Sequence, residues 1–249
     1  GERVREEGVP GKVASFKNNT AVVDDSYGCH ENYLMDRRTS FKQIVEHLMC
    51  FFVTRQIYTG SGKVGSENRS HPCDFQISQR SDFFETEVAL DTMVKRPIVN
   101  TRDEPHADRE KYRRLHVIVG DSNLSEVSTY LRTGVTAIVL ALIEDGEIDR
   151  GLSIREPVRA IKEISHDTEC RYECPMERRG RMTAVQIQQE YLEAALRYFS
   201  SREIDPITKD VMTRWQSVLA KLADDPMQLD REIDWVIKRR LLLKYMDRK

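Results

Sequence analysis

Four helix-start signals in the second half of this 249-residue chain constrain its fold more than any other feature. Each combines a capping side chain or a proline with a following run of helix-forming residues: Pro157, Thr183 with Gln186, Asp205-Pro206, and Asp225-Pro226. Strand-like segments lie mainly in the first half. This order predicts an α+β fold with a strand-rich region at 1–120 and a helix-rich region at 121–249.

The first half contains several short segments of strand character. Residues 11–38 mix strand-like pieces with a polar turn, and Phe75–Arg80 alternates between apolar and polar residues. RPIVN and LHVIVGD, which begin at Arg96 and Leu115, are predicted as two further strands.

Two helices are predicted outside the four signalled above. Ser40 and Gln43 form a capping box for a helix that runs through about Thr54. Asp121 or Ser122 can cap a long helix that is apolar on most faces and ends at Gly146, so we expect it to be buried.

The composition describes a globular chain: 39% of the residues are hydrophobic, 32% are charged, and the net charge is −2. No global basic field favours nucleic acid as a partner. No apolar run reaches the roughly 18–20 residues that span a bilayer, and the first residues lack a signal-peptide core, so we expect a cytoplasmic protein. The five cysteines are expected to be reduced thiols.

The stretch from Arg102 to Arg114 packs nine charged residues and a histidine between two apolar segments. Pro105 interrupts it and favours a shaped loop over a charged helix. Together with Arg80, its arginines supply guanidinium groups that suit phosphate oxygens. The alternative is a surface salt-bridge network among the following charged residues: Arg102, Asp103, Glu104, Asp108 and Arg109.

Other polar motifs give weaker signals. GSGKVG fails the P-loop pattern, so it is predicted to be a flexible hairpin loop, with a phosphate contact from Lys63 as the alternative. Glu85 and Glu87 share a face if their segment is a strand, but diverge by about 200° if it is a helix. His30 and Glu31 are neighbours, so only one of them can face a ligand from a strand; a surface turn is the alternative.

Several long blocks of this sequence resemble the Pup ligase/Pup deamidase (depupylase) family. They are FKNNT, SYGCHENYL, FFVTRQ, FQISQRSDFFE, RPIVNTRDEPHADREKYRRLHVIVGDSNLSE and EIDWVIKRRLL. The family is related to glutamine synthetase, so the resemblance implies a curved antiparallel sheet that cradles ATP and Mg²⁺ and is backed by helices.

FQISQRSDFFETEV and VMTRWQSVLAKLADDPM resemble the deamidase branch, whereas REIDWVIKR is closer to the ligase branch; on balance the deamidase is favoured. This implies an amidohydrolase that converts the C-terminal Gln of Pup, a small disordered protein modifier, to Glu. It would also cleave the isopeptide bond between Pup and a substrate lysine. The alternatives are a Pup–protein ligase and a truncated, non-catalytic protein that binds Pup or nucleotide.

The resemblance also implies roles for individual residues. Arg80 and Arg102 match active-site arginines that contact phosphate or the Pup side chain, and His116 falls at the expected metal–phosphate site. Arg113 and Arg114 are weaker candidates for the same anion. His30 and Glu31 belong to a family motif whose role is not assigned.

The family's metal-binding Glu-x-Glu strand and its catalytic Asp have no counterpart between Gly1 and Lys249. Glu85 and Glu87 match the deamidase's own internal segment and not that acidic strand. We therefore expect residues 1–249 to be an internal part of a large catalytic domain. The acidic strand and the catalytic Asp are expected before Gly1 and a small C-terminal domain after Lys249, so the chain alone is expected to be inactive.

Overall fold

The computed structural model describes Asn19, Tyr27 and residues 29–90, 96–103, 107–149 and 151–247. The elements of its first half are β1 (Glu31–Asp36), α2 (Phe41–Thr54), α3 (Gln56–Thr59), β2 (Lys63–Val64), β3 (Phe75–Gln76), the 3₁₀ helix η1 (Ser81–Phe83), β4 (Phe84–Ala89), β5 (Arg96–Asn100) and β6 (Tyr112–Val117). Those of its second half are α4 (Glu126–Glu144), α5 (Pro157–His166), β7 (Glu173–Pro175), β8 (Arg181–Thr183), α6 (Ala184–Phe199), α7 (Pro206–Asp224), the 3₁₀ helix η2 (Pro226–Leu229) and α8 (Asp234–Met246). The strand-like pieces predicted before Tyr27, and Pro105, lie outside the described residues.

Most of the predicted helix starts are confirmed. The Thr183/Gln186 capping box of α6 has both of its hydrogen bonds, and the Asp205 side chain accepts from two backbone N–H groups at the start of α7. At α2 only half of the predicted box forms. The Ser40 hydroxyl accepts from the Gln43 N–H, but the Gln43 side chain donates to the carbonyl of Ile143 instead of turning back.

Two predicted helix starts are wrong. Helix α4 is capped by Ser125 and not by Asp121 or Ser122, because the Asp121 carboxylate is buried and accepts hydrogen bonds elsewhere. Asp225-Pro226 opens only the short η2, and α8 begins at Asp234.

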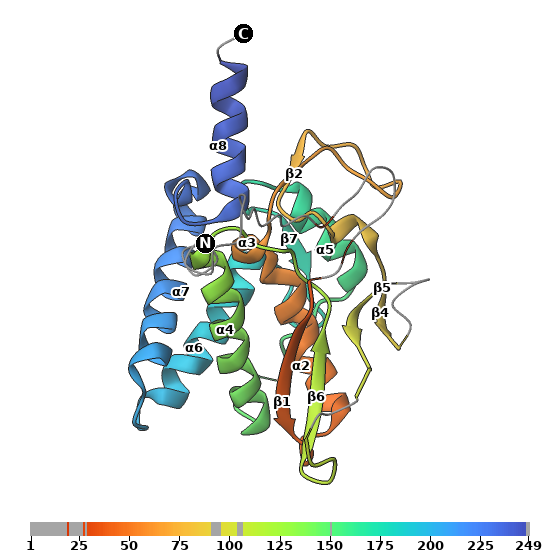
Figure 1. Cartoon of the computed structure of the whole chain (residues 1–249), viewed down its shortest axis with the longest axis vertical. Helices are drawn as coiled ribbons and strands as arrows, with labels where there is room; N and C mark the ends of the chain where they lie inside the picture. The colour runs from red at the N-terminus through yellow and green to blue at the C-terminus, as the bar shows by residue number, and fades with distance from the viewer. Residues whose placement is uncertain are drawn as a thin grey trace, which may run out of the picture.

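The α+β prediction is confirmed. Among the described residues the strands form four two-stranded pairs, and one of these pairs differs from the predicted antiparallel arrangement (Figure 1). The pairs β1–β6, β2–β3 and β7–β8 are antiparallel, as expected, but β4 and β5 run parallel. The strand predicted for Phe75–Arg80 is also shorter than expected and ends at Gln76. Strand β6 ends at Val117, and the carbonyl groups that follow it accept hydrogen bonds from arginine side chains.

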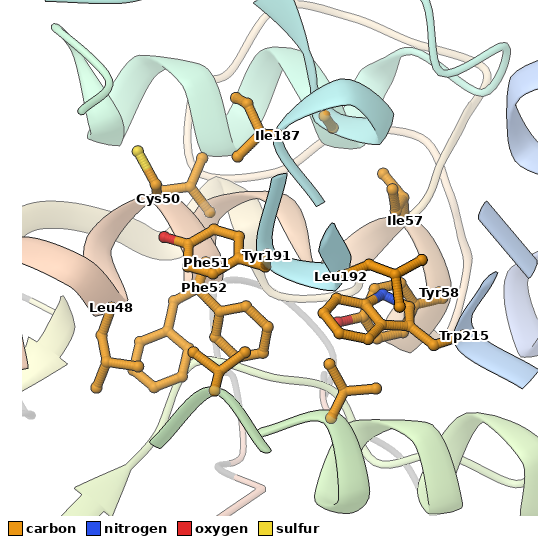
Figure 2. Close-up of a cluster of buried hydrophobic side chains, with 14 of the residues drawn as sticks. Leu48, Cys50, Phe51, Phe52, Ile57, Tyr58, Ile187, Tyr191, Leu192 and Trp215 are labelled. Carbon is orange, nitrogen blue, oxygen red and sulfur yellow. The ribbon is translucent and has the colours of Figure 1, made fainter. Parts of the chain in front are cut away.

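Helix α2 lies at the centre of the fold, between the β1–β6 and β4–β5 strand pairs and the helices of the second half (Figure 1). Every residue from His47 to Thr54 is buried. Figure 2 shows the cluster around it, in which Phe51 meets Tyr191 of α6 with ring centroids 5.5 Å apart. The Tyr191 hydroxyl donates to the carbonyl of His47 at 2.6 Å, so the polar atom of this buried ring is satisfied.

Helix α4 is long and apolar enough to cross a membrane by length and composition, unlike the sequence expectation. Half of that window is buried inside the structure, and α4 packs against α6, α7 and β1. Such packing is typical of the core helix of a globular domain. The five cysteines are free, as predicted.

Candidate functional site

Polar and basic side chains gather on one face of the β1–β6 pair. Residues on the opposite face, such as Met35, Leu115 and Val117, point into the core. Alternation along the strands therefore places Asn32 and His116 together on the outer face, where they are register partners. Nδ1 of His116 lies 3.0 Å from the Asn32 side-chain oxygen, and the Arg114 guanidinium lies 3.4 Å from the same oxygen.

His30 completes this cluster from the residue just before β1. Its ring meets the His116 ring edge-on, with centroids 4.9 Å apart and planes at 80°. Partial burial lowers the pKa of His30, and the nearby charges of Arg80 and Arg102 lower it further. Of these causes, the positive charges of Arg80 and Arg102 would also attract an anion. The structure thus brings His30, Arg80, Arg102 and His116 to one place, with Arg114 beside them.

Arg80 contributes positive charge to this cluster from a buried position. Its side chain is buried, and its guanidinium donates to the main-chain carbonyls of Ile118 and Gly120. Burial lowers the pKa of Arg80 to about 10, which leaves the group charged at neutral pH. Arg80 was expected to contact phosphate or Pup directly. In this structure its donors hold the backbone that follows β6.

Arg102 is an exposed member of the cluster. Its backbone N–H donates to the Asn100 side chain at 2.9 Å, and its guanidinium has no ion-pair partner among the described residues. The neighbouring Asp103 instead pairs with Arg37 at 2.6 Å and accepts from the backbone N–H of Arg114. The side chain of Arg102 is therefore available to a ligand.

The alternative salt-bridge network is not seen in the described part of the charged stretch. Asp103 pairs with Arg37, and Asp108 pairs with Lys111 at 3.6 Å. Both partners lie outside the set that was expected to form the network. Glu104 falls outside the described residues.

Two of the predicted site residues point away from this face. Glu31 is buried and pairs with Arg55, with oxygen and nitrogen 2.6 Å apart. Of the neighbours His30 and Glu31, only His30 thus meets the open face, as strand alternation requires. The Arg113 guanidinium lies over the Phe41 ring, 5.2 Å from its centroid, on the side opposite His116.

The weaker motifs are used structurally. Lys63 lies in β2 and pairs with Glu67, and its ammonium also faces the Phe83 ring. Glu85 and Glu87 share the exposed face of strand β4, so the strand alternative is correct and the helix alternative is wrong.

A divalent metal does not fit the donors that the structure describes. Within the described residues, no group of three His, Cys, Asp or Glu side chains is arranged to hold a metal ion. The predicted metal role of His116 therefore stays a prediction that rests on the resemblance alone.

Three residues next to the site, the buried Arg55 and Asp121 and the half-buried Arg132, were not predicted as part of it. The Arg55 guanidinium donates to Glu31 and to the carbonyl of Val119, at 2.6 and 2.5 Å. Arg132 donates to the carbonyl of Asp121 and to the sulfur of Cys29, at 2.5 and 3.0 Å.

The Asp121 carboxylate is the third of these residues. It accepts from the backbone N–H groups of Ser61 and Gln79 and from the Ser78 hydroxyl, at 2.7, 2.8 and 3.0 Å. The available signal for Arg55 was a charged residue inside the apolar run FFVTRQIY. In the sequence, a buried Asp121 cannot be told from a helix-capping Asp121, so it was predicted to be a helix cap.

Comparison with known proteins identifies the family of the chain. The family model described as "Pup-ligase protein" matches residues 2–249. The chain is 54% identical to a depupylase of Acidothermus cellulolyticus, over 95% of this chain and 48% of that protein, and 46% identical to a Pup–protein ligase of Kineococcus radiotolerans, over 98% and 54%. The Pup ligase PafA, solved in complex with ADP, superposes with a TM-score of 0.84 at 39% identity, covering 99% of this chain and 55% of that one.

The chain spans about half the length of the curated relatives it matches. A match of this identity over nearly every residue of the chain is far more than a shared fold, and the basic cluster on the β1–β6 face is part of the matched region. The chain therefore belongs to the Pup-ligase protein family.

Proposed function

We propose that this sequence is part of an ATP-dependent depupylase, which deamidates the C-terminal Gln of Pup and cleaves Pup–lysine isopeptide bonds. The observation that carries the choice of branch is the identity of 54% to one relative named Depupylase; a Pup–protein ligase and two relatives named Pup deamidase/depupylase are 45–46% identical. A cytoplasmic location and Pup or pupylated proteins as partners belong to the same proposal.

The basic cluster supports the nucleotide part of this proposal. Arg102 offers an exposed guanidinium group and His30 an exposed ring on the open face of β1–β6, and Arg114 and the buried His116 lie beside them. Guanidinium forks bind phosphate oxygens well, so the cluster fits a nucleotide phosphate. The structural likeness to a ligase solved with ADP points to the same ligand class.

The described residues do not supply the chemistry of bond cleavage. Mg²⁺ is part of the expected family chemistry, but the acidic ligands it prefers are not gathered in the described part of the chain. In this proposal the residues on the β1–β6 face bind and orient an anionic group, and they take no part in activating water.

The branch is tested in a protein of the relatives' full length that carries this sequence. It would be incubated with ATP and a pupylated protein, and separately with ATP, Pup and a lysine-containing target. We expect release of free Pup in the first reaction and no new conjugate in the second. Conjugate formation without release would identify a ligase.

The ligase remains the second candidate because of two specific likenesses. The chain is 46% identical to a Pup–protein ligase and superposes closely on PafA. Such an enzyme would transfer a phosphoryl group from ATP to the γ-carboxylate of a Pup C-terminal Glu, and a lysine amine would then displace phosphate from this acyl phosphate to form the isopeptide bond. The basic cluster would serve either reaction, so only the assay above separates them.

A further inference from the structure

Four consecutive carbonyl groups, from Ile118 to Asp121, each accept a hydrogen bond from an arginine. Arg80 donates to the first and third, Arg55 donates to Val119, and Arg132 donates to Asp121. The three guanidinium groups come from different parts of the chain: the end of α2, the segment before η1, and α4. Three charged side chains thus bind one segment of four residues.

The segment needs donors because it lies where the strand pairing stops. Strand β6 ends at Val117, opposite the first residue of β1, so the carbonyls that follow have no ladder partner. Ile118 and Val119 are buried, and buried carbonyls are costly unless they are hydrogen-bonded. Neutral donors would meet this requirement, so the use of arginines calls for a further reason.

Arg55 joins the start of β1 to the chain just after β6 by direct hydrogen bonds to both, whereas Arg132, which donates to the Asp121 carbonyl, approaches Glu31 only to 3.9 Å. One amino group of its guanidinium contacts Glu31, the first residue of β1, and the carbonyl of Val119, just after β6. The other amino group contacts Glu31 and the Thr136 hydroxyl. A Cβ added at Gly120 would lie 3.3 Å from the Arg55 guanidinium and 3.4 Å from the Glu31 carboxylate, so glycine allows this close approach.

The two ends that Arg55 joins are the ones that carry the paired histidines. His30 precedes Glu31 directly, and His116 lies two residues before Ile118. The distance between the two rings therefore depends on how the start of β1 is held against the end of β6. We propose that Arg55 is a positioning residue, whose guanidinium fork sets His30 against His116 and so shapes the anion site.

The competing explanation is that Arg55 only fills the core. Its charge is fully buried and paired with Glu31, and such pairs can matter for stability alone. A purely structural role predicts that substitutions change stability but leave the two histidine rings in contact. A positioning role predicts that the contact changes in a protein that is still folded.

The test compares Arg55→Lys with the control Arg240→Lys in the 249-residue chain. Lysine keeps the charge but lacks the planar fork, so it cannot hold Glu31 and the Val119 carbonyl together in the same geometry. Arg240, on helix α8, makes an ion pair of the same length with Asp230, 2.6 Å, but this pair is partly exposed and lies away from the histidines. Two quantities are measured: the nuclear Overhauser effect between the ring protons of His30 and His116, and the Kd for ADP.

We expect Arg55→Lys to lose the His30–His116 effect while circular dichroism shows a folded protein, and Arg240→Lys to retain it. The Kd for ADP should rise by about 10-fold or more, since supporting residues of a binding site have effects of that order. Retention of the ring contact in folded Arg55→Lys would overturn the proposal, whatever happens to the melting temperature.

A second variant covers the case in which Arg55→Lys does not fold. Arg55→Met combined with Glu31→Gln removes both charges of the pair, which proteins tolerate better than the loss of one. The same loss of the ring contact is expected in it. If neither variant folds, Arg55 is a stability residue and the positioning role is overturned.

The inference rests on the proposed nucleotide site only for its effect on affinity. If the unsubstituted chain fails to bind ADP, the proposed function loses its support. The ring contact still decides the role of Arg55.

Discussion

Single residues on the β1–β6 face differ in how much of their charge is available to a ligand. Arg80 uses its donors on main-chain carbonyls, whereas the Arg102 guanidinium is exposed and has no ion-pair partner among the described residues. Both charges lower the pKa of His30, so both contribute to the local field. Arg102 is thus available for direct contact with a ligand, whereas Arg80 contributes through its electrostatic field.

Replacement of Arg102 by alanine should weaken nucleotide binding without unfolding the protein. Charged hydrogen bonds are worth roughly 1.5–3 kcal/mol, so the Kd for ADP, measured by calorimetry, should rise by about 10-fold or more. Arg109→Ala, which removes an exposed arginine from the same charged stretch, is the control and should bind as before. Equal affinities in the two variants would assign Arg102 to the protein surface.

Asp82 should make stability depend on pH in the acid range. Burial opposes its ionisation, but hydrogen bonds from His166, the Glu67 N–H and Gln76 outweigh this and lower its pKa from 3.8 to about 2. Because the pKa is lower in the folded state, the ionised carboxylate stabilises the protein above pH 3.8, and this contribution is lost as the pH falls towards 2. The shift corresponds to about 2 kcal/mol.

Urea unfolding of the unsubstituted chain and of Asp82→Asn, from pH 2 to pH 6, measures this contribution. The difference in unfolding free energy between them should be largest above pH 4 and should shrink towards pH 2. A difference that stays constant across this range would show that the Asp82 charge is not involved.

At the scale of elements, the capping box of α6 gives a direct prediction. Thr183→Ala removes the hydroxyl that accepts from the Gln186 N–H, and N-cap losses of this kind cost about 1 kcal/mol. The measurement is the free energy of urea unfolding. Thr133→Ala, inside α4 and exposed, is the control, since alanine is well suited to a helix interior. Equal effects of the two substitutions would argue against the cap.

Helices were more predictable than the sheet, for a local reason. Caps such as Thr183 and Asp205 act within three residues of themselves, so the sequence shows them directly. The parallel pairing of β4 and β5 runs against the local expectation, because only six residues separate the two strands and so short a connection normally gives an antiparallel pair. Asp121 shows the limit of local signals: its partners Ser61 and Gln79 are 60 and 42 residues away, so a buried acceptor was taken for a helix cap.

The candidate site was predictable in part for the same reason. Alternation correctly separated His30 from Glu31, because that rule concerns adjacent residues. Arg113 was grouped with Arg114 by its position in the sequence, yet it lies over Phe41 on the other face. The Arg55–Glu31 pair spans 24 residues, and only the fold brings it beneath the histidines.

For the whole molecule, the central helix α2 links the strand-rich and helix-rich regions. It contacts β5 of the first region and α5 and α6 of the second, with the buried Phe51 facing Tyr191 (Figure 2). Two regions that share one core helix should unfold together, because neither can expose α2 without losing its own apolar contacts.

Phe51→Ala tests this coupling. The loss of a buried phenylalanine costs about 3–5 kcal/mol, and the cost should appear equally in both regions. Hydrogen exchange measured by mass spectrometry in low urea should show the same drop in protection for peptides from β6 and from α6. Ile207→Ala, at a side chain that is 67% exposed, should change neither. If protection falls in α6 peptides alone, the two regions unfold separately and α2 belongs energetically to the helical one.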